Sequence, residues 1–276
     1  MSSDASDSEA TDSEATDSEA TDSDASESGA PVPDLSAPDL SAPDLSAPDL
    51  PVPDLSDPGA WDPRTRHAQE AYTRRRLAVY DAVVLGLFCS VVWRCPRGDM
   101  LRLYRRATGA RHLDIGPGTG YFLDRCGFTG PPPEITLLDL SQECLEMSAH
   151  RLARYRPRTC RANLLEPLPL PDGAFDSVAL SLVLHTVPGG WDAKGKSFAE
   201  MARVLRPGGT LFGSTVLAEG VRMNALTRRL LVEQHRRGNF QNQGDSPDGL
   251  ARALAAHFPF SRVVVRGNVA LFRATA

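Results

Sequence analysis

The stretch that decides the fold is residues 112–122, which read HLDIGPGTGYF. An apolar strand that contains an acid, Asp114, runs into glycines at alternate positions, Gly116, Gly118 and Gly120, and then into the start of a helix. Glycine has no Cβ, so the backbone of such a loop can come close to a ligand, and the helix that follows directs free N–H groups at it. The G-x-G-x-G spacing is one residue shorter than the G-x-G-x-x-G of dinucleotide-binding loops, which favours an adenosyl ligand other than a nicotinamide dinucleotide.

Residues 1–58 differ in composition from the rest of the chain. They contain no Lys, Arg or aromatic residue and hold 16 of the 35 acidic residues, in short repeats such as TDSEA and APDL. Such a segment cannot bury enough apolar surface to offset chain entropy, so we expect a disordered arm. The rest of the chain then carries 19 acids and all 30 bases, a net charge of +11. That excess fits a nucleic-acid or anionic-surface footprint, but we favour a solubility-promoting tail beside an Arg-rich domain.

Cysteine usage and the N-terminus indicate the compartment. Five cysteines without a C-x-x-C pair point to neither a disulfide framework nor a zinc site. The acidic N-terminus lacks the basic start and apolar stretch of a signal peptide. The charge-free run 82–93 is too short to cross a bilayer. We therefore expect a cytoplasmic protein without a transmembrane segment.

From residue 110 onward, short apolar strands alternate with segments of helical length. We expect strands over 111–115, 134–138, 175–184 and 209–216, another just before residue 161, and helices over 69–93, 99–106, 142–155, 197–205, 222–237 and 247–258. A closing hairpin is expected from 262–266 and 270–273. The alternation predicts a doubly wound α/β sheet with parallel strands, in which ligands bind at the carboxyl ends of the strands, where the strand order reverses.

Polar residues follow these strands at their carboxyl ends. Asp139 comes after the second strand, 25 positions beyond Asp114, where it can accept hydrogen bonds from two ribose hydroxyls. Ser141 is the better candidate for the cap of the next helix, which leaves Asp139 for a ligand. The third strand is followed by RANL, and the fourth ends in SLVLH, which closes with His185.

Residues 106–216, with these motifs, resemble the class I S-adenosylmethionine-dependent methyltransferases, most of all the branch that acts on small molecules, including those of secondary metabolism. The resemblance implies a mostly parallel seven-stranded sheet with a C-terminal antiparallel hairpin and a helical cap over the cofactor. It implies that Asp114 and the three glycines of the loop lie at the methionine end of S-adenosylmethionine. Asp139 would hold the ribose and Leu140 would pack on the adenine.

Three further residues complete the cofactor-binding set that the resemblance implies: Asn163, Leu164 and Ser181. An Asp commonly stands at the position of Asn163 in this family and receives the adenine amino group. The amide oxygen of Asn163 can accept the same hydrogen bond without the charge assistance that strengthens it. We expect this replacement of the usual Asp by Asn163 to affect the affinity for the cofactor.

The resemblance also divides the chain. We expect residues 1–58 to form the arm and residues 61–276 to form a methyltransferase domain. Within this domain, the helical cap is expected over 61–107 and the cofactor-binding core over 108–216. The acceptor-side region, with the C-terminal strands, is expected over 217–276. The acceptor is expected to be a small molecule, and its methylated atom, oxygen, nitrogen or carbon, stays open. No metal and no nucleic acid is expected as a partner, and nothing in the sequence indicates an oligomeric state.

A hydroxyl or acidic carbon as acceptor benefits from a general base. His185 is the first candidate because it follows the fourth strand, close to the methyl group in transfer, and Tyr80 on the cap is the second. His185 could equally hydrogen-bond a neighbouring loop or face solvent. His235, Asn239 and Asn242 could line an acceptor pocket or belong to a plain surface turn.

Two other classes of protein share parts of this pattern. A nicotinamide-dependent oxidoreductase would need the longer glycine spacing and a catalytic Tyr and Lys, whereas the only lysines here are Lys194 and Lys196. A noncatalytic binding module would fit the net charge of +11, but such a scaffold has no need for the glycine loop and Asp139. We therefore expect a methyltransferase.

Overall fold

The computed structural model describes residues 89–276, so the arm, Tyr80 and most of the predicted cap lie outside the described residues. The helices and strands follow one another in the order α3 (Arg97–Ala107), β1 (Arg111–Ile115), α4 (Tyr121–Arg125), β2 (Glu134–Asp139), α5 (Gln142–Arg151), η3 (Ala153–Tyr155), β3 (Arg158–Arg161), β4 (Phe175–Ser181), η4 (Leu184–Thr186), α6 (Trp191–Val204), β5 (Leu205–Val216), α7 (Ala225–Arg236), α8 (Pro247–Ala255), β6 (Phe260–Arg266) and β7 (Val269–Thr275). The labels η3 and η4 denote single 3₁₀ turns.

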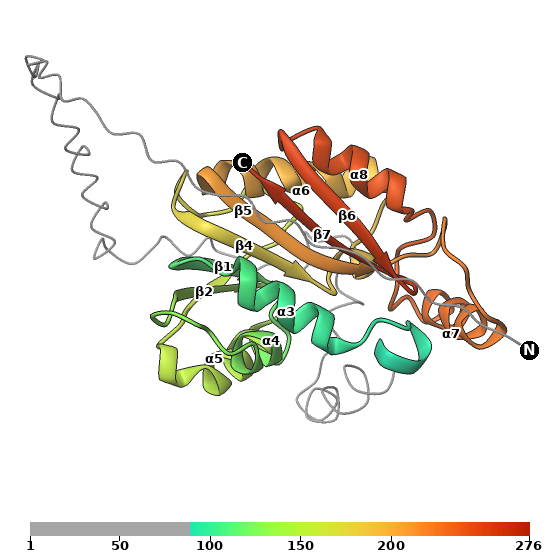
Figure 1. The fold of residues 1–276 in the computed structure, drawn as a ribbon, viewed down its shortest axis with the longest axis horizontal. Coiled ribbons are helices and arrows are strands. Elements are labelled where there is room, and N and C mark those ends of the chain that lie inside the picture. Colours follow the sequence, from blue (N-terminus) through green and yellow to red (C-terminus); the bar gives the residue numbers. More distant parts are fainter. Residues whose placement is uncertain (1–88) are drawn as a thin grey trace, which may run out of the picture. The chain divides into compact units, whose positions relative to one another are not determined.

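These strands form one seven-stranded sheet in the order β3-β2-β1-β4-β5-β7-β6 (Figure 1). β1 to β5 are mutually parallel, while β7 pairs antiparallel with both β5 and β6. The predicted fold, a parallel sheet with a C-terminal hairpin, is confirmed. The strand order reverses between β1 and β4, so a ligand site is expected where the carboxyl ends of these two strands meet.

Helices cover both faces of the sheet and bury a separate apolar core on each (Figure 1). On one face, α6 and α8 bury Phe198 and Leu250 against strand residues such as Val178. On the other face, α3, α4 and α5 bury side chains that include Tyr104 and Phe122. Because helices cover both faces of the sheet, β1, β2 and β4 are buried over most of their length, including polar residues such as Asp114.

Several element boundaries differ from the predicted ones, and three of these differences are described next. β4 ends at Ser181 instead of residue 184, because Leu182 takes a left-handed conformation with φ of 58° and turns the chain out of the strand. α6 begins at Trp191, well before the predicted start at residue 197. Gly195 lies inside this helix, and the packing of buried α6 side chains such as Phe198 into the core overrides the low helix propensity of glycine. β5 begins at Leu205, four residues before the predicted start at residue 209, and therefore includes Pro207 and Gly208.

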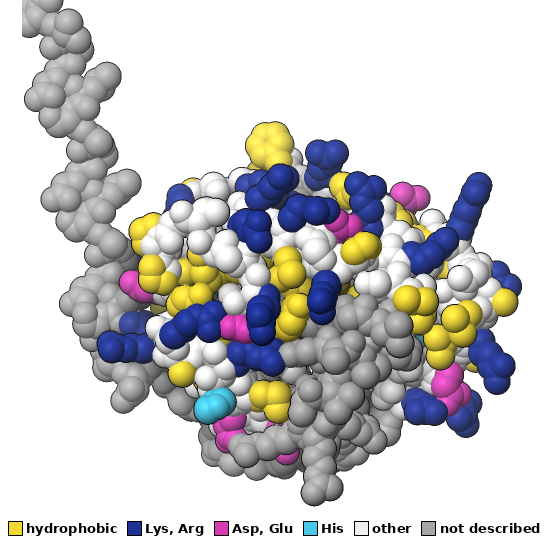
Figure 2. Space-filling view, turned by 60° about the horizontal axis from the view of Figure 1, so that its bottom comes forward, with side chains coloured by type: hydrophobic (Ala, Val, Ile, Leu, Met, Phe, Trp, Pro, Cys, Tyr) yellow, Lys and Arg dark blue, Asp and Glu magenta, His cyan; other side chains and the backbone are white. Residues whose placement is uncertain are grey.

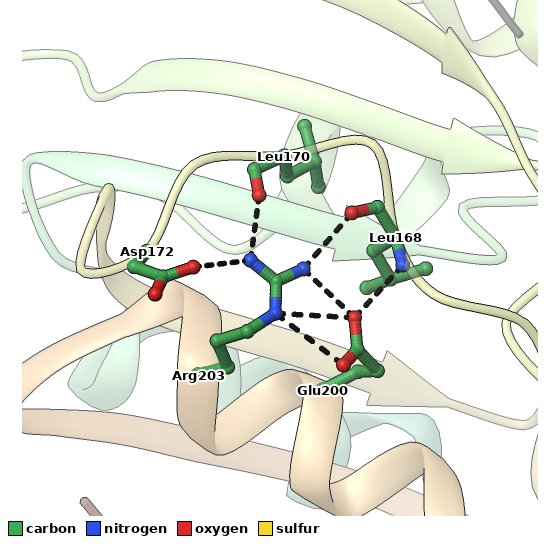
Figure 3. Close-up of polar contacts among 5 residues, drawn as sticks. All are labelled: Leu168, Leu170, Asp172, Glu200 and Arg203. Carbon is green, nitrogen blue, oxygen red and sulfur yellow. Dashed lines mark hydrogen bonds and ion pairs between the residues drawn. The ribbon is translucent and has the colours of Figure 1, made fainter.

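One arginine of α6 fixes the connection between β3 and β4 (Figure 3). Arg203 donates hydrogen bonds to the carbonyl oxygens of Leu168, at 2.9 Å, and Leu170, at 2.8 Å. Its guanidinium also forms ion pairs with Asp172 and Glu200. Because this connection begins directly after β3, Arg203 helps to hold the residues that follow β3 at the edge of the sheet.

The surface of the described part is rich in arginine, as the charge excess of the sequence implies. Figure 2 shows one face on which Lys and Arg side chains clearly outnumber Asp and Glu. On the C-terminal hairpin, Arg262 of β6 stands opposite Arg273 of β7, and both are exposed. Within residues 89–276, no helix has the length and apolarity needed to cross a membrane.

Candidate functional site

A cavity lies at the carboxyl ends of the strands, where the strand order reverses. Its walls come from the segments that follow β1, β2, β3 and β4, together with Tyr104 of α3. Seven of the predicted cofactor-binding residues line it together: Gly116, Gly118, Asp139, Leu140, Asn163, Leu164 and Ser181. The topology thus brings together residues that lie as many as 65 positions apart in the sequence.

The glycine loop forms the side of the cavity next to β1. Gly116 has φ of 66°, and a Cβ at this position would lie 2.3 Å from Cγ2 of Val183, so only glycine allows the loop to pack on the segment after β4. Gly118 has φ of 55°, and a Cβ there would meet no atom within 4 Å. The open space above Gly118 lets a ligand approach the backbone closely.

Gly120 and Asp114 stand behind the cavity and are absent from its lining. A Cβ on Gly120 would lie 3.3 Å from atoms of Ser148 and Leu152, so this glycine lets the loop pack closely on α5 and the residue that ends it. Asp114 is only 2% exposed, and the hydroxyl of Tyr104 donates to its carboxylate with distances of 3.2 Å and 3.4 Å to the two oxygens. Burial raises the pKa of Asp114 to about 8.

Asp139 ends β2 and is presented to the cavity. Its Oδ1 accepts a hydrogen bond of 2.8 Å from the backbone N–H of Ser141. Removal from solvent raises the pKa of Asp139 to about 6, although the backbone N–H groups of Leu140 and Ser141 stabilise the carboxylate. The side chain of Ser141 is the N-cap of α5, as predicted, so the Asp139 carboxylate is not needed for capping.

Asn163 lines the cavity after β3 and already has two internal partners. Its Oδ1 accepts a hydrogen bond of 3.1 Å from the N–H of Leu165, and its Nδ2 donates to Glu166 at 2.9 Å. A carbonyl oxygen has two lone pairs, so Oδ1 can accept one more donor. The amide is therefore held in one orientation and keeps one acceptor position.

The tip of β4 contributes an unusual backbone and an unpaired hydroxyl. Leu182 has a positive φ, which is rare for a branched side chain and is concentrated at functional sites, and its N–H donates to Ser214 at 2.7 Å. The Oγ of Ser181 is buried beside the cavity and lies near the Tyr104 hydroxyl, but it makes no hydrogen bond of normal geometry within the described residues. Such a group calls for a polar ligand or water.

His185 lies in the turn η4, next to the cavity but not among its lining residues. The side chain is 5% exposed, and its ring packs on Phe240 with centroids 4.4 Å apart. Burial, with a smaller contribution from the nearby Lys194, lowers the pKa of His185 to about 3, so the imidazole is neutral at physiological pH. Its Nδ1 is buried without a hydrogen-bond partner within residues 89–276.

The polar residues of the 234–245 region hold this loop together, and none of them lines the described cavity. Nε2 of His235 and Oδ1 of Asn242 are 2.7 Å apart, and Nδ2 of Asn242 donates to the carbonyl of Val216 at 2.8 Å. Asn239 donates to Gln234 at 2.9 Å. No group of His, Cys, Asp and Glu side chains in the described part of the chain is arranged to hold a metal ion.

Two groups of residues that line the cavity were not predicted from the sequence. Tyr104 lines the cavity, yet its position in an amphipathic helix is typical of a core residue. The turn residues Thr186, Val187 and Pro188 also line it, because β4 ends early and the chain bends back towards the glycine loop. The only local signal for this bend is the Pro-Gly-Gly segment that follows Val187.

Comparison with known proteins supports the methyltransferase that the sequence predicts. The pattern of a methyltransferase domain matches residues 113–213. The demethylluteothin O-methyltransferase of Streptomyces thioluteus is 43% identical over 206 residues, which cover 75% of this chain and 90% of that protein. The physcion biosynthesis cluster O-methyltransferase of Aspergillus chevalieri is 36% identical over 203 residues, 72% of this chain and 90% of that protein.

Solved structures share the fold at low sequence identity. The geranyl diphosphate C-methyltransferase of Streptomyces coelicolor A3(2), solved with S-adenosyl-L-homocysteine, superimposes with a TM-score of 0.50 at 15% identity, over 65% of this chain and 74% of that one. The sheet is Rossmann-like and carries the glycine loop at its switch point. The sequence identity to the Streptomyces thioluteus protein points to the same family. This chain belongs to the class I S-adenosylmethionine-dependent methyltransferase family.

Proposed function

We propose that the protein transfers a methyl group from S-adenosyl-L-methionine to a hydroxyl oxygen of a small secondary metabolite. The observation that carries this proposal is the cavity at the switch point, in which the glycine loop, Asp139 and Asn163 stand in the order that the parts of an adenosyl cofactor require. The relatives named as O-methyltransferases support oxygen as the methylated atom.

The residues present fit the cofactor. The Asp139 carboxylate has an oxygen beyond the one that Ser141 occupies and can accept ribose hydroxyls. Leu140 offers an apolar surface for the adenine, next to Leu164, and the remaining lone pair of Asn163 can accept the adenine amino group. The open space above Gly118 and the unpaired hydroxyl of Ser181 suit the polar methionine end. The bound cofactor supplies an electrophilic methyl group on a sulfonium sulfur.

His185 is proposed as the base that takes the proton of the acceptor hydroxyl. Its imidazole is neutral at physiological pH, so Nδ1 or Nε2 is able to accept a proton, and Phe240 fixes the ring. A pKa near 3 makes this imidazole a weak base, so the reaction favours acceptors whose hydroxyl is already acidic. Phenols and enols are therefore the expected acceptor class. Tyr80 remains the second candidate and lies outside the described residues.

A methyl-transfer assay tests this function. The purified full chain is incubated with S-adenosylmethionine that carries a trideuterated methyl group and with a panel of phenols, enols, aliphatic alcohols and amines. Mass spectrometry then detects products that are heavier by the labelled methyl group. We expect transfer to a phenol or enol and none to aliphatic alcohols. Transfer to amines alone would overturn the assignment of oxygen, and a protein that binds neither S-adenosylmethionine nor S-adenosylhomocysteine would overturn the function itself.

A further inference from the structure

The methionine end of the proposed cofactor carries a positive ammonium group, and the cavity has little to balance it. Among the described residues that line the cavity, Asp139 is the only one with a carboxylate, and the proposed function assigns it to the ribose. Asp114, the acid of the glycine motif, is buried behind the lining. An ammonium in this cavity therefore needs a group that connects it to Asp114.

Tyr104 occupies that position. It lines the cavity, and its hydroxyl donates a hydrogen bond to the Asp114 carboxylate at 3.2 Å. Packing fixes the ring: it stacks on Phe122 with centroids 5.2 Å apart and meets the edge of Phe212 at 5.1 Å. A phenol that donates its proton to a carboxylate keeps oxygen lone pairs that can accept an N–H from a cation.

We propose that Tyr104 is a cofactor-positioning residue: its hydroxyl receives the ammonium of the methionine end and passes the charge of Asp114 to it, and Asp114 releases a proton to solvent as the ammonium binds. This inference rests on the proposed function for the identity of the ligand. Tyr104 lies outside residues 113–213, the part that the family pattern matches, so the family resemblance did not indicate it. The Ser181 hydroxyl beside the same end of the cavity offers a second neutral partner.

Proton release follows from the surroundings of Asp114. The ionisable groups that face it within the described residues are Tyr104 on α3, Asp139 after β2 and Cys126 after α4, and none of them is a cation. Burial, reinforced by the charge of Asp139, raises the pKa of Asp114 to about 8, against a hydrogen bond from Tyr104 that lowers it. At pH 7 the carboxyl of the ligand-free protein is therefore mostly protonated. An ammonium brought to Tyr104 favours the carboxylate, so one proton leaves Asp114 for the buffer.

Two ligands separate this role from a merely structural one. S-adenosylhomocysteine carries the ammonium, whereas 5′-methylthioadenosine has the adenosine and sulfur but no amino-acid part. We expect Tyr104→Phe to weaken S-adenosylhomocysteine binding by about tenfold, the loss typical of a hydrogen bond to a charged group, and to leave 5′-methylthioadenosine binding within about twofold. Tyr155→Phe, a tyrosine of η3 outside the cavity, is the matched control and should change neither.

A second measurement uses the unmodified protein and does not depend on the folding of any variant. Calorimetric titrations at pH 7 in buffers with different ionisation enthalpies should show release of nearly one proton with S-adenosylhomocysteine and none with 5′-methylthioadenosine. An equal loss of affinity for both ligands in Tyr104→Phe, an unchanged affinity for S-adenosylhomocysteine, or binding without proton release would each overturn the inference. A protein that binds neither ligand would instead overturn the proposed function.

Discussion

A buried ion pair between α6 and the loop that follows α7 allows a quantitative test of how that loop is held. Nζ of Lys194, in α6, lies 2.7 Å from Oδ2 of Asp245, and the two side chains are 0% and 1% exposed. Lys194 also donates to the carbonyl of Gln241 at 3.2 Å, and the N–H of Gln241 donates to the carbonyl of His185 at 2.7 Å. The pair thus connects α6 to the loop that supports the proposed base.

Replacing Lys194 by Met keeps the volume and removes the charge, which leaves the Asp245 carboxylate buried and unpaired. Breaking a buried ion pair on one side costs about 3 to 5 kcal/mol, and a domain of this size loses roughly 2 to 4 °C of melting temperature per kcal/mol. We therefore expect Lys194→Met to melt about 6 to 20 °C below the unmodified protein. The double variant Lys194→Met with Asp245→Asn should recover much of this loss, because no charge remains buried.

The loss of stability in Lys194→Met should also depend on pH. Burial raises the pKa of Asp245, and Lys194 opposes this shift, so the pKa of Asp245 should rise further in Lys194→Met. A carboxyl whose folded pKa is raised is tolerated at low pH and destabilises the fold as pH rises through that pKa. The difference in unfolding free energy between the two proteins should therefore grow from pH 5 to pH 8.

Urea unfolding monitored by circular dichroism measures these free energies, and Lys196→Met is the matched control. Lys196 lies two residues further on in the same helix and is exposed, so its replacement should change stability by less than about 0.5 kcal/mol. A cost below about 1 kcal/mol for Lys194→Met, or a double variant no more stable than the single one, would refute the reasoning.

Further predictions concern the cavity itself. Gly116→Ala should destabilise the fold by about 1 to 3 kcal/mol in urea unfolding and abolish cofactor binding. The Cβ of the alanine would collide with Val183, and the φ of this position is positive. Normal cofactor binding by this variant would contradict the packing of the loop. Asp139→Ala should weaken S-adenosylhomocysteine binding about tenfold or more in calorimetry. In the unmodified protein the protonation of Asp114 already lowers the affinity below pH 8, and the fall should steepen as pH drops through the pKa of Asp139, about 6; a slope that does not steepen below pH 6 would exclude the Asp139 carboxylate as a ribose acceptor. His185→Ala should lower the initial rate of methyl transfer at unchanged cofactor affinity, and full turnover would remove His185 from the chemistry.

The local parts of the site could be predicted from the sequence. β1 has the predicted bounds, and the glycine loop and Asp139 lie where the alternation of strands and helices places them. These predictions succeed because their signals are local: apolar runs of strand length, glycines at fixed spacing and a serine cap, each read within a few residues.

Features that depend on contacts distant in sequence could not be predicted. Tyr104 reaches the cavity because α3 packs over β5 at Phe212, more than 100 positions away. His185 is buried against Phe240 from a loop that follows α7, and Lys194 finds its partner Asp245 in the same loop. Nothing in the residues next to His185 indicates that Phe240 packs on it. The sequence therefore suggested that the His185 side chain lies in the cavity, whereas in the structure it packs beside the cavity.

Equilibrium binding of the cofactor tests the central claim most directly. Isothermal titration of the purified full chain with S-adenosylmethionine and S-adenosylhomocysteine should show one saturable site for each, which weakens strongly in Asp139→Ala and is unchanged in Lys196→Met. Absence of binding by either compound, in a protein that melts cooperatively, would contradict the account.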